Sequence, residues 1–303
     1  MDRFIGRDFI SLKDYSREEL FFYLHTARQM KMRKGRGYYS SILHDRNLAM
    51  VFQKPSLRTR VSFQVGMNQL GGSALYISPQ EIGLGKRESI KDVARVLSRM
   101  VDGVMARVFE HEHLLELAEN ATVPIINGLS DLLHPCQGLA DYLTMQEIFS
   151  DLCGLRIAYV GDGNNVCHSL MYGAERFGAS MTIACPKGYE PDKGVTRDVS
   201  GADIEITHSP EDAVSGAQVI YTDTWASMGQ EDEHAARLKD FEGFQVNKGL
   251  LSHADPAHVV MHCLPAHRNE EITDSVIDGD HSAVYIQAEN RLHAQKAVLA
   301  LNL

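Results

Sequence analysis

The sequence predicts an α/β protein with two domains, each built from a parallel sheet flanked by helices. The chain has 303 residues, a length more typical of two hydrophobic cores than of one. Short apolar runs alternate with segments of helical periodicity, which is the pattern of parallel sheets with crossover helices. Polar and charged motifs directly follow many of the apolar runs, and open parallel sheets bind their ligands at this end of their strands.

The candidate strands are short apolar runs separated by helical or turn-forming segments. In chain order they are Leu48–Phe52, Gly103–Val108, Val123–Asn127, Leu155–Val160, Met181–Ala184, Val219–Thr222, Val259–Cys263 and Val284–Gln287. Among the segments between them, Ser89–Met100 has apolar residues at helical spacing, and its first residues, from Ser89 to Asp92, have a capping-box pattern.

A domain boundary is expected where helical periodicity ends after residue 149. The segment Gln137–Phe149 has the periodicity of a helix, and Ser150–Gly154 breaks that pattern before the next candidate strand. We therefore expect one domain over residues 1–149 and a second over residues 150–303. The last segment, Ala288–Leu301, again has helical periodicity, and we expect a helix over about 288–303 to pack back on the first domain.

Composition excludes several classes of protein. The net charge is -10, with acidic and basic residues interleaved, which argues against a nucleic-acid-binding surface. The five cysteines are odd in number and include no C-x-x-C, so neither a disulfide framework nor a zinc site is indicated and a reducing compartment is expected. No signal, transit or membrane-spanning segment is recognised. We expect a cytoplasmic protein with no membrane partner and no metal.

The motif Ser56-Leu-Arg-Thr-Arg60, which follows the first candidate strand, is suited to binding an anion. Apolar residues continue at helical spacing to Leu70, and Gly71-Gly72 supplies a stop, so the motif opens a helix. Backbone N–H groups and the dipole at a helix N-terminus favour an anion, and two arginines and a hydroxyl add donors for phosphate oxygens. The alternative interpretation is a capped surface helix with solvated arginines.

Arg107 and the motif His134-Pro-Cys-Gln137 suit the reacting groups of such a site. Arg107 ends the second candidate strand, and the motif follows the third. Beside a phosphate site, His134 can polarise a carbonyl oxygen and Gln137 supplies an amide. A lone histidine in this setting would more often be structural, and Cys136 is expected to be a small packed side chain.

The motif Gly161-Asp-Gly-Asn-Asn165 is similar to part of a dinucleotide-binding turn. Val166 stands where the third glycine of that fingerprint would be, so the turn for a pyrophosphate is incomplete and NAD is not expected. Asparagines at the start of a helix are better suited to holding the polar headgroup of an amino acid, which makes Asn165 a candidate ligand residue.

Asp223 and Cys263 each lie at the end of a candidate strand. Asp223 is followed by the turn Ser227-Met228-Gly229; its carboxylate can pair with an ammonium group, and backbone amides of the turn can bind a carboxylate. The alternative is an Asx-type turn after a strand. Cys263 precedes Leu264-Pro265, and alone it would more often be a buried, inert thiol.

Taken in chain order, these motifs resemble those of the carbamoyltransferases. S-x-R-T-R marks the wider family, whereas G-D-G-N-N, D-x-x-x-S-M-G and H-C-L-P resemble the ornithine-specific branch. The stretches Lys86-Arg-Glu-Ser-Ile-Lys-Asp92 and Glu289-Asn-Arg291 are also similar, and the resemblance covers about residues 45 to 295. Leu57 departs from the threonine of many members; we expect this position to contribute mainly its backbone N–H.

The resemblance implies transfer of a carbamoyl group from carbamoyl phosphate to L-ornithine, giving L-citrulline and phosphate as in arginine biosynthesis, with no cofactor. It implies two α/β domains linked by interdomain helices, and a homotrimer or a multiple of trimers, in which the loop Gly83–Glu88 reaches a neighbouring subunit. The implied carbamoyl phosphate residues are Ser56, Leu57, Arg58, Thr59, Arg107, His134, Gln137, Cys263, Leu264 and Arg291. The implied ornithine residues are Asn165, Asp223, Ser227 and Met228. Among them, the expected catalytic residues are Arg107, His134, Asp223 and Cys263.

Other acceptors and a non-catalytic role stay open at this point. Aspartate would need extra cationic groups, putrescine has no α-carboxylate for the amide turn, and an N-acylated ornithine lacks the free α-ammonium that Asp223 would meet. These features favour ornithine. A ligand-binding relative without catalysis is disfavoured because such a protein need not retain every implied phosphate-binding and reacting side chain. A dehydrogenase is disfavoured by Val166.

Overall fold

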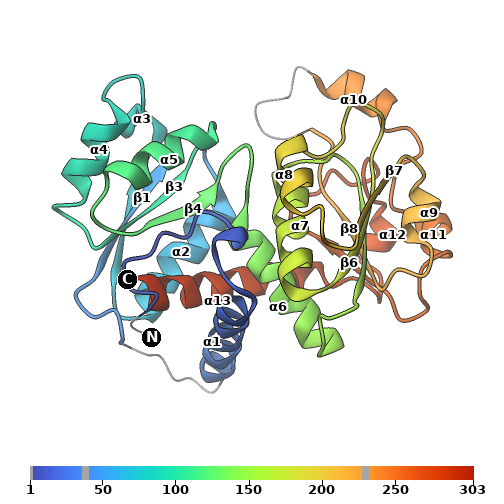
Figure 1. The fold of residues 1–303 in the computed structure, drawn as a ribbon, viewed down its shortest axis with the longest axis horizontal. Helices are drawn as coiled ribbons and strands as arrows, with labels where there is room; N and C mark the ends of the chain where they lie inside the picture. Colours follow the sequence, from blue (N-terminus) through green and yellow to red (C-terminus); the bar gives the residue numbers. More distant parts are fainter. Residues whose placement is uncertain (1–2, 36–40, 227–232) are drawn as a thin grey trace. The chain divides into compact units, whose positions relative to one another are not determined.

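The chain folds into two compact units, each with its own parallel sheet. The computed structural model describes residues 3–35, 41–226 and 233–303 (Figure 1). The first unit contains Met1–Leu143 and Asn290–Leu303, and the second contains Thr144–Glu289. The chain passes from one to the other within α6 (Pro135–Phe149) and returns within α13 (Val284–Asn302). The predicted α/β class is confirmed, whereas the domain limits at residues 149 and 150 stay a prediction.

The sheet of the first unit has four parallel strands in the order β2-β1-β3-β4. Their bounds are β1 Asn47–Phe52, β2 Ser73–Ile77, β3 Gly103–Arg107 and β4 Ile125–Leu129. Every residue of β3 and β4 is buried, whereas β2, at the edge, is only partly covered. The strands β3 and β4 are therefore covered on both faces, as expected for a parallel sheet flanked by helices.

Helices cover both faces of this sheet. On one face, the core joins β1 and β3 to α4 (Ile90–Leu97) and α5 (His111–Asn120). On the other, a Cβ added to Gly103 would meet Leu303 at 3.1 Å, and one added to Gly66 of α2 (Leu57–Gln69) would meet Lys296 at 3.4 Å. The end of α13 therefore packs against the sheet and α2.

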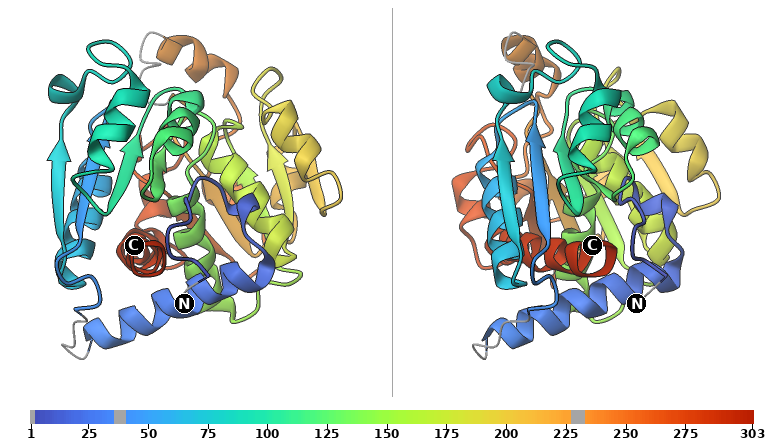
Figure 2. Two further views of the ribbon diagram at one scale, coloured as in Figure 1. Left: turned by 60° about the vertical axis from the view of Figure 1, so that its left-hand side comes forward. Right: turned by 90° about the vertical axis from the view of Figure 1, so that its left-hand side faces the viewer.

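The N-terminal segment runs beside the end of α13, as the views in Figure 2 agree. It contains η1 (Leu12–Asp14) and α1 (Arg17–Gly35). Tyr23 of α1 donates its hydroxyl to Asn302 Oδ1 at 2.8 Å, and Lys31 Nζ lies 2.8 Å from Asn290 Oδ1. Residues far apart in the chain are thus held together inside the first unit. The short α3 (Pro79–Ile82) follows β2.

The sheet of the second unit has five parallel strands in the order β7-β6-β5-β8-β9. Their bounds are β5 Arg156–Val160, β6 Ser180–Ala184, β7 Ile204–Thr207, β8 Val219–Thr222 and β9 Val259–His262. The order reverses beside β5, so β5 and β8 mark the switch point at which ligands bind in open α/β sheets. Polar residues that follow these two strands therefore lie in the favoured position for a site.

Helices also flank the second sheet, as Figure 1 shows for α7 and α8 and for α9, α11 and α12. Their bounds are α7 Asn165–Phe177, α8 Lys193–Asp198, α9 Pro210–Val214, α10 His234–Asp240, α11 Lys248–Leu251 and α12 Asp274–Ile277. One core cluster joins inward residues of β5, β8 and β9 to α9, α11 and α12, and it includes Trp225 stacked on Phe241 with ring centroids 5.3 Å apart. No helix among the described residues has the length and apolarity needed to span a membrane.

Most of the element predictions are confirmed, and each error has a physical cause. The predicted strand Val284–Gln287 is wrong because these residues form the first turn of α13, and a short apolar run cannot be distinguished from a buried helical turn by periodicity. The edge strands β2 and β7 were not predicted; both have partly exposed residues, which weakens the apolar signal. The predicted helix from Ser89 is confirmed, and the Ser89 side chain accepts from Asp92 N.

Candidate functional site

The first group of predicted site residues surrounds the start of α2. Ser56 is the N-cap residue, and its Oγ accepts from Thr59 N at 3.4 Å. Because α2 begins directly after β1, this N-terminus lies at the carboxyl edge of the first sheet. Thr59 is buried, Arg58 is half-buried, and the Leu57 side chain is 75% exposed. Leu57 could therefore serve an anion through its backbone N–H without its side chain taking part.

The hydroxyl of Thr59 accepts hydrogen bonds from two arginines that lie far apart in the chain. Arg107 Nη1, at the end of β3, and Arg291 Nη2, in α13, each donate to Thr59 Oγ1 at 3.4 Å. Ser56 Oγ lies 3.1 Å from the same atom. Both arginines are only 5% exposed, and packing places the two buried cations against a single hydroxyl.

His134 and Gln137, at the start of α6, complete this group. Arg291 Nη1 donates to Gln137 Oε1 at 2.6 Å and lies 3.5 Å from His134 Nε2, while Gln137 Nε2 donates to Asp141 Oδ1 at 2.7 Å. Burial, followed by the charges of Arg291 and Arg107, holds the pKa of His134 well below its usual value. His134 is therefore neutral at physiological pH. Because a guanidinium only donates, Nε2 accepts in this contact and Nδ1 carries the proton.

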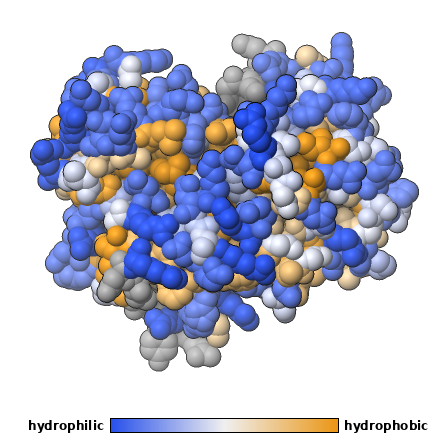
Figure 3. Space-filling model, viewed as in Figure 1, coloured by the Kyte–Doolittle hydropathy of each residue, from blue (hydrophilic) through white to orange (hydrophobic). Residues whose placement is uncertain are grey.

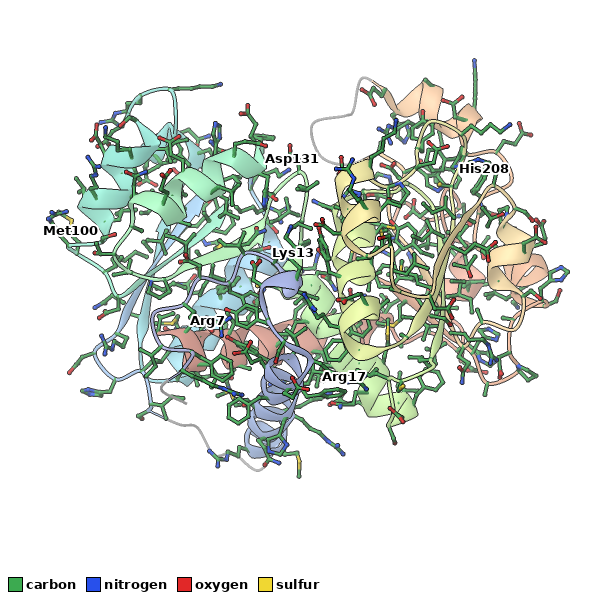
Figure 4. All side chains as sticks on the ribbon, in the orientation of Figure 1. Arg7, Lys13, Arg17, Met100, Asp131 and His208 are labelled. Carbon is green, nitrogen blue, oxygen red and sulfur yellow. The ribbon has the colours of Figure 1, made fainter. Side chains whose placement is uncertain are left out.

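Lys54 belongs with this group, although the sequence analysis gave it no role. Burial and the neighbouring Arg107 lower its pKa to about 8, while Asp131, labelled in Figure 4, acts in the opposite direction. Its ammonium lies 4.9 Å from the centre of the Phe109 ring. The signal for Lys54 was its place between β1 and the capped start of α2. Lys54, Arg107 and Arg291 together make this part of the first unit strongly cationic, which suits a doubly charged anion.

The second group lies at the carboxyl edge of the second sheet, around Asp223. This residue follows β8 and is 6% exposed. Its Oδ2 accepts from Asn164 Nδ2 at 2.8 Å, and its Oδ1 accepts from Cys263 Sγ at 3.0 Å and from Thr224 N at 2.8 Å. These three donors fix the orientation of the carboxylate.

Asn164, the residue before the predicted Asn165, contacts Asp223. Asn164 caps α7, and its Oδ1 accepts from Val166 N at 2.9 Å and Cys167 N at 3.2 Å. This geometry leaves its Nδ2 directed at the carboxylate. The sequence signal was available, because an asparagine that caps a helix presents its amide nitrogen away from the helix. Asn165 is the first residue of α7 and is half-buried, and its assignment to ornithine stays a prediction.

A fully buried pair shapes the segment that carries Cys263 and Leu264. His262 Nε2 lies 3.0 Å from Glu271 Oε1, with both side chains 0% exposed, and Leu264 N donates to His262 Nδ1 at 2.9 Å. Since Nδ1 accepts, Nε2 carries the proton and donates to the carboxylate. Leu264 has φ +61°, a left-handed conformation that needs such support in a non-glycine residue.

Asp223, His262 and Cys263 have potential metal-ligand atoms within 4.8 Å of one another. Both imidazole nitrogens of His262 are engaged by Leu264 and Glu271, and the thiol of Cys263 donates to Asp223. Asp223 and Cys263 are thus joined by a hydrogen bond, and the imidazole lone pair of His262 accepts from Leu264 N and is not directed at a shared ion. Ser227 and Met228 lie outside the described residues.

Comparison with known proteins gives the family. Residues 7–147 match the family described as "Aspartate/ornithine carbamoyltransferase, carbamoyl-P binding domain", and residues 153–302 match its "Asp/Orn binding domain". The chain belongs to the aspartate/ornithine carbamoyltransferase family. The resemblance found in the sequence motifs is thereby confirmed, and the matched regions carry the first and second site groups respectively, apart from Arg291.

Relatives within this family cover the chain almost end to end. It is 55% identical over 302 residues to a protein of Thermococcus kodakarensis named "Ornithine carbamoyltransferase", covering 98% of this chain and 96% of that protein. It is 54% identical over 302 residues to the Pyrococcus furiosus "Ornithine carbamoyltransferase, anabolic", with the same coverage.

Solved structures of the family share the fold. The ornithine carbamoyltransferase from Pyrococcus furiosus superposes with a TM-score of 0.95 at 54% identity, covering 98% of this chain and 97% of that one. The enzyme from Thermus thermophilus gives a TM-score of 0.89 at 44% identity, covering 97% and 99%.

Arg291 belongs by sequence to one matched domain of the family but packs with residues of the first unit. It lies within the range matched by the Asp/Orn binding domain, yet its guanidinium contacts Thr59 and Gln137 of the first unit. Six predicted residues are thus brought together there: Ser56, Thr59, Arg107, His134, Gln137 and Arg291. The second unit brings together Asp223 and Cys263, with Leu264 next in the chain.

Proposed function

We propose that this chain transfers the carbamoyl group of carbamoyl phosphate to the side-chain amine of L-ornithine, giving L-citrulline and phosphate as in arginine biosynthesis. The observation that carries this proposal is the convergence of Arg107 and Arg291 on the Thr59 hydroxyl beside a neutral His134. The names of relatives more than 50% identical to this chain support the same reaction.

In this proposal the first unit binds carbamoyl phosphate. The N-terminal amides of α2, with Ser56, Arg58 and Thr59, bind the phosphate, and Arg107 and Lys54 supply further positive charge. These groups stabilise the charge that develops on phosphate as its bond to the carbamoyl carbon breaks. Carbamoyl phosphate is already activated, so positioning and charge stabilisation supply much of the rate.

Neutral His134 and Arg107 are proposed to polarise the carbamoyl group. Neutral His134 is proposed to donate a ring N–H to the carbonyl oxygen, and Arg107 supports the oxyanion of the tetrahedral intermediate. Gln137 is fixed between Arg291 and Asp141 at 2.6 and 2.7 Å, which suits it to orient the carbamoyl amide. The family resemblance adds Cys263 and Leu264 as further residues for the carbamoyl group.

The second unit provides recognition of the amino acid. Asp223 is a buried carboxylate with fixed orientation, suited to the α-ammonium of ornithine. Asn165 and the backbone amides of Ser227 and Met228 are proposed to bind the remaining polar atoms. The side-chain amine attacks in its neutral form, and Cys263, 3.0 Å from Asp223, is proposed to orient it.

A ureido-product assay tests the reaction and its acceptor. Carbamoyl phosphate is supplied with L-ornithine, putrescine, N-acetylornithine or aspartate in parallel. We expect product from L-ornithine and at most a trace from the others. Product mainly from another amine would replace ornithine in the proposal, and failure with every amine would favour a non-catalytic relative.

We also propose a homotrimer, or a multiple of trimers, located in the cytoplasm. Figure 3 shows a mostly hydrophilic face interrupted by apolar areas, and large apolar side chains are exposed on α2 and β2: Leu57 (75%), Val61 (50%) and Leu75 (54%). Exposed apolar surface beside an edge strand suits burial by another subunit. The loop Gly83–Glu88 is proposed to reach the neighbouring site. All five cysteines are free thiols, which fits a reducing compartment.

A further inference from the structure

Two imidazoles and a carboxylate meet on the surface of the second unit, apart from the residues assigned above. His234 is the first residue of α10, and His267 and Glu270 belong to the turn that follows β9. Glu270 Oε2 lies 2.9 Å from His234 Nε2 and 3.6 Å from His267 Nδ1. All three potential ligand atoms lie within 4.8 Å of one another.

We propose that these residues bind a divalent transition-metal ion of the zinc class. Two imidazole nitrogens and one carboxylate oxygen form a common zinc ligand set, in which water takes the fourth position. Ligands at 2.0–2.1 Å from a tetrahedral ion are about 3.3 Å apart, and the observed separations of 2.9 and 3.6 Å lie on either side of that value. Small side-chain rotations complete the site.

A hydrogen bond alone accounts for only part of this arrangement. A proton shared by His234 and Glu270 explains their 2.9 Å separation. It gives no partner to His267 Nδ1, an atom shielded from solvent that has no hydrogen bond among the described residues. A cation at the shared position uses the lone pairs of both histidines and a carboxylate oxygen at once.

The turn that carries His267 and Glu270 has a well-supported backbone. Glu270 N donates to His267 O at 3.0 Å, His267 N donates to Glu271 Oε1 at 2.6 Å, and Gln245 Nε2 donates to Glu270 O at 2.9 Å. Both ligand side chains are therefore presented from a fixed frame, which lowers the entropy lost when an ion binds.

The start of α10 is held in place independently. Arg237, one turn after His234, donates to Asp162 Oδ2 at 3.0 Å and to Trp225 O at 2.7 Å, and its guanidinium lies 5.0 Å from the centre of the Tyr189 ring. The contacts of the buried Arg237 therefore fix the position of the helical turn that carries His234. The ion would link the start of α10 to the turn after β9, and no strand pairing among the described residues joins these two segments.

The neighbouring charges permit a cation here. Arg268 adjoins His267 in the chain, but its guanidinium is paired with Asp274 at 2.6 Å and with Asp278. Arg237 is likewise paired with Asp162 and Glu233, each at 3.0 Å. Because the nearby arginines are neutralised by carboxylates, Glu270 is left to balance the charge of the ion.

Titration of the metal-free protein with Zn²⁺ by calorimetry, and with Co²⁺ by absorption, tests the site. The Cys263→Ala variant serves as a parallel background, since it removes the thiol near Asp223. We expect one equivalent of metal to bind in both backgrounds. His267→Ala and Glu270→Gln should each lower affinity at least about 10-fold, the least effect seen even for outer-shell partners.

The matched control is His208→Ala, which removes an exposed histidine of the same unit that lies 3.8 Å from Glu190 and is labelled in Figure 4. It should bind Zn²⁺ as the unchanged protein does. Zn²⁺ should also raise the melting temperature of the unchanged protein but not of His267→Ala, whose fold is checked by circular dichroism. Equal affinity in His267→Ala, loss of binding in Cys263→Ala, or no binding at all would overturn the proposal. Each outcome is independent of carbamoyl transfer.

Discussion

At the scale of the residue, the planar guanidinium of Arg291 joins three neighbours. It donates to Gln137 Oε1 at 2.6 Å and to Thr59 Oγ1 at 3.4 Å, and it lies 3.5 Å from His134 Nε2. A fork of fixed donors can meet several acceptors at once, whereas an ammonium acts as a single point charge. The identity of this residue therefore matters beyond its charge.

Arg291→Lys is expected to lower kcat/KM for carbamoyl phosphate by about 10- to 100-fold, the equivalent of one lost charged hydrogen bond. The charge is retained, but the contacts with Thr59 and Gln137 cannot both be made. Steady-state kinetics at saturating ornithine measures the effect. Arg268→Lys is the control, because Arg268 pairs with surface carboxylates. Similar losses in both variants would contradict the assignment.

Lys54 should make phosphate binding depend on pH. Its pKa is about 8, so the side chain is cationic below that pH and becomes neutral as the pH rises through it. Affinity for inorganic phosphate should therefore fall between pH 7.5 and 9.5, by up to about 30-fold relative to Lys54→Arg, whose guanidinium stays charged. Phosphate affinity is measured by calorimetry for both proteins in the same buffers. The change in protonation of phosphate itself is then the same in both series and drops out of the comparison. Parallel pH profiles would show that Lys54 does not contact the anion.

At the scale of the element, the turn after β9 is supported by one buried carboxylate. Glu271 Oε1 accepts from His267 N at 2.6 Å and faces His262 Nε2 at 3.0 Å. Gln287, from the first turn of α13, accepts from His262 N at 2.9 Å and donates to Tyr221 OH at 3.0 Å. The strand, the turn and the helix thus share one network, which positions Cys263 and Leu264.

Glu271→Ala should lower the free energy of unfolding by about 2–5 kcal/mol, because the buried His262 Nε2 and the part-buried His267 N lose their acceptor. Glu271→Gln keeps an acceptor oxygen and should recover most of that stability. Urea denaturation with EDTA measures both, with Glu270→Ala as a half-buried neighbour control. If Glu271 positions Cys263 and Leu264 for the reaction, KM for ornithine should rise more in Glu271→Ala than in Glu271→Gln. An unchanged KM in a folded Glu271→Ala protein would argue for a purely structural role.

At the scale of the whole molecule, the proposed assembly depends on apolar surface near one edge of the first sheet. Val61 on α2 and Leu75 on the edge strand β2 are exposed in the single chain. Leu115, on α5 between β3 and β4, is also exposed but lies toward the opposite edge in the strand order. Charged substitutions at these positions therefore distinguish an interface from ordinary surface.

Val61→Glu and Leu75→Glu should each shift the protein from a trimer of about 101 kDa, three times the chain mass of 33.8 kDa, toward the monomer. Burying an unpaired carboxylate in an apolar interface is costly. Light scattering coupled to size-exclusion chromatography gives the mass, and Leu115→Glu should leave it unchanged. A monomeric starting protein, or a trimer that tolerates both substitutions, would contradict the proposal.

The pattern of residues along the chain was enough to predict the α/β class, most of the strands and the family. Ser56 could be recognised as a helix cap, and Val166 argued against a dinucleotide turn, because such signals depend on residues a few positions apart. Arg107, His134 and Asp223 could be proposed as site residues because polar side chains after parallel strands gather at one edge of a sheet.

Tertiary structure decided which of these residues meet. Packing of α13 into the first unit brings Arg291 to Thr59, the cap of α7 directs Asn164 at Asp223, and burial beside Arg107 makes Lys54 a weaker base. It also brings His234 to His267 and Glu270. Local periodicity is set by neighbours along the chain, whereas these contacts form only when distant segments exclude water together, so their partners cannot be read from spacing.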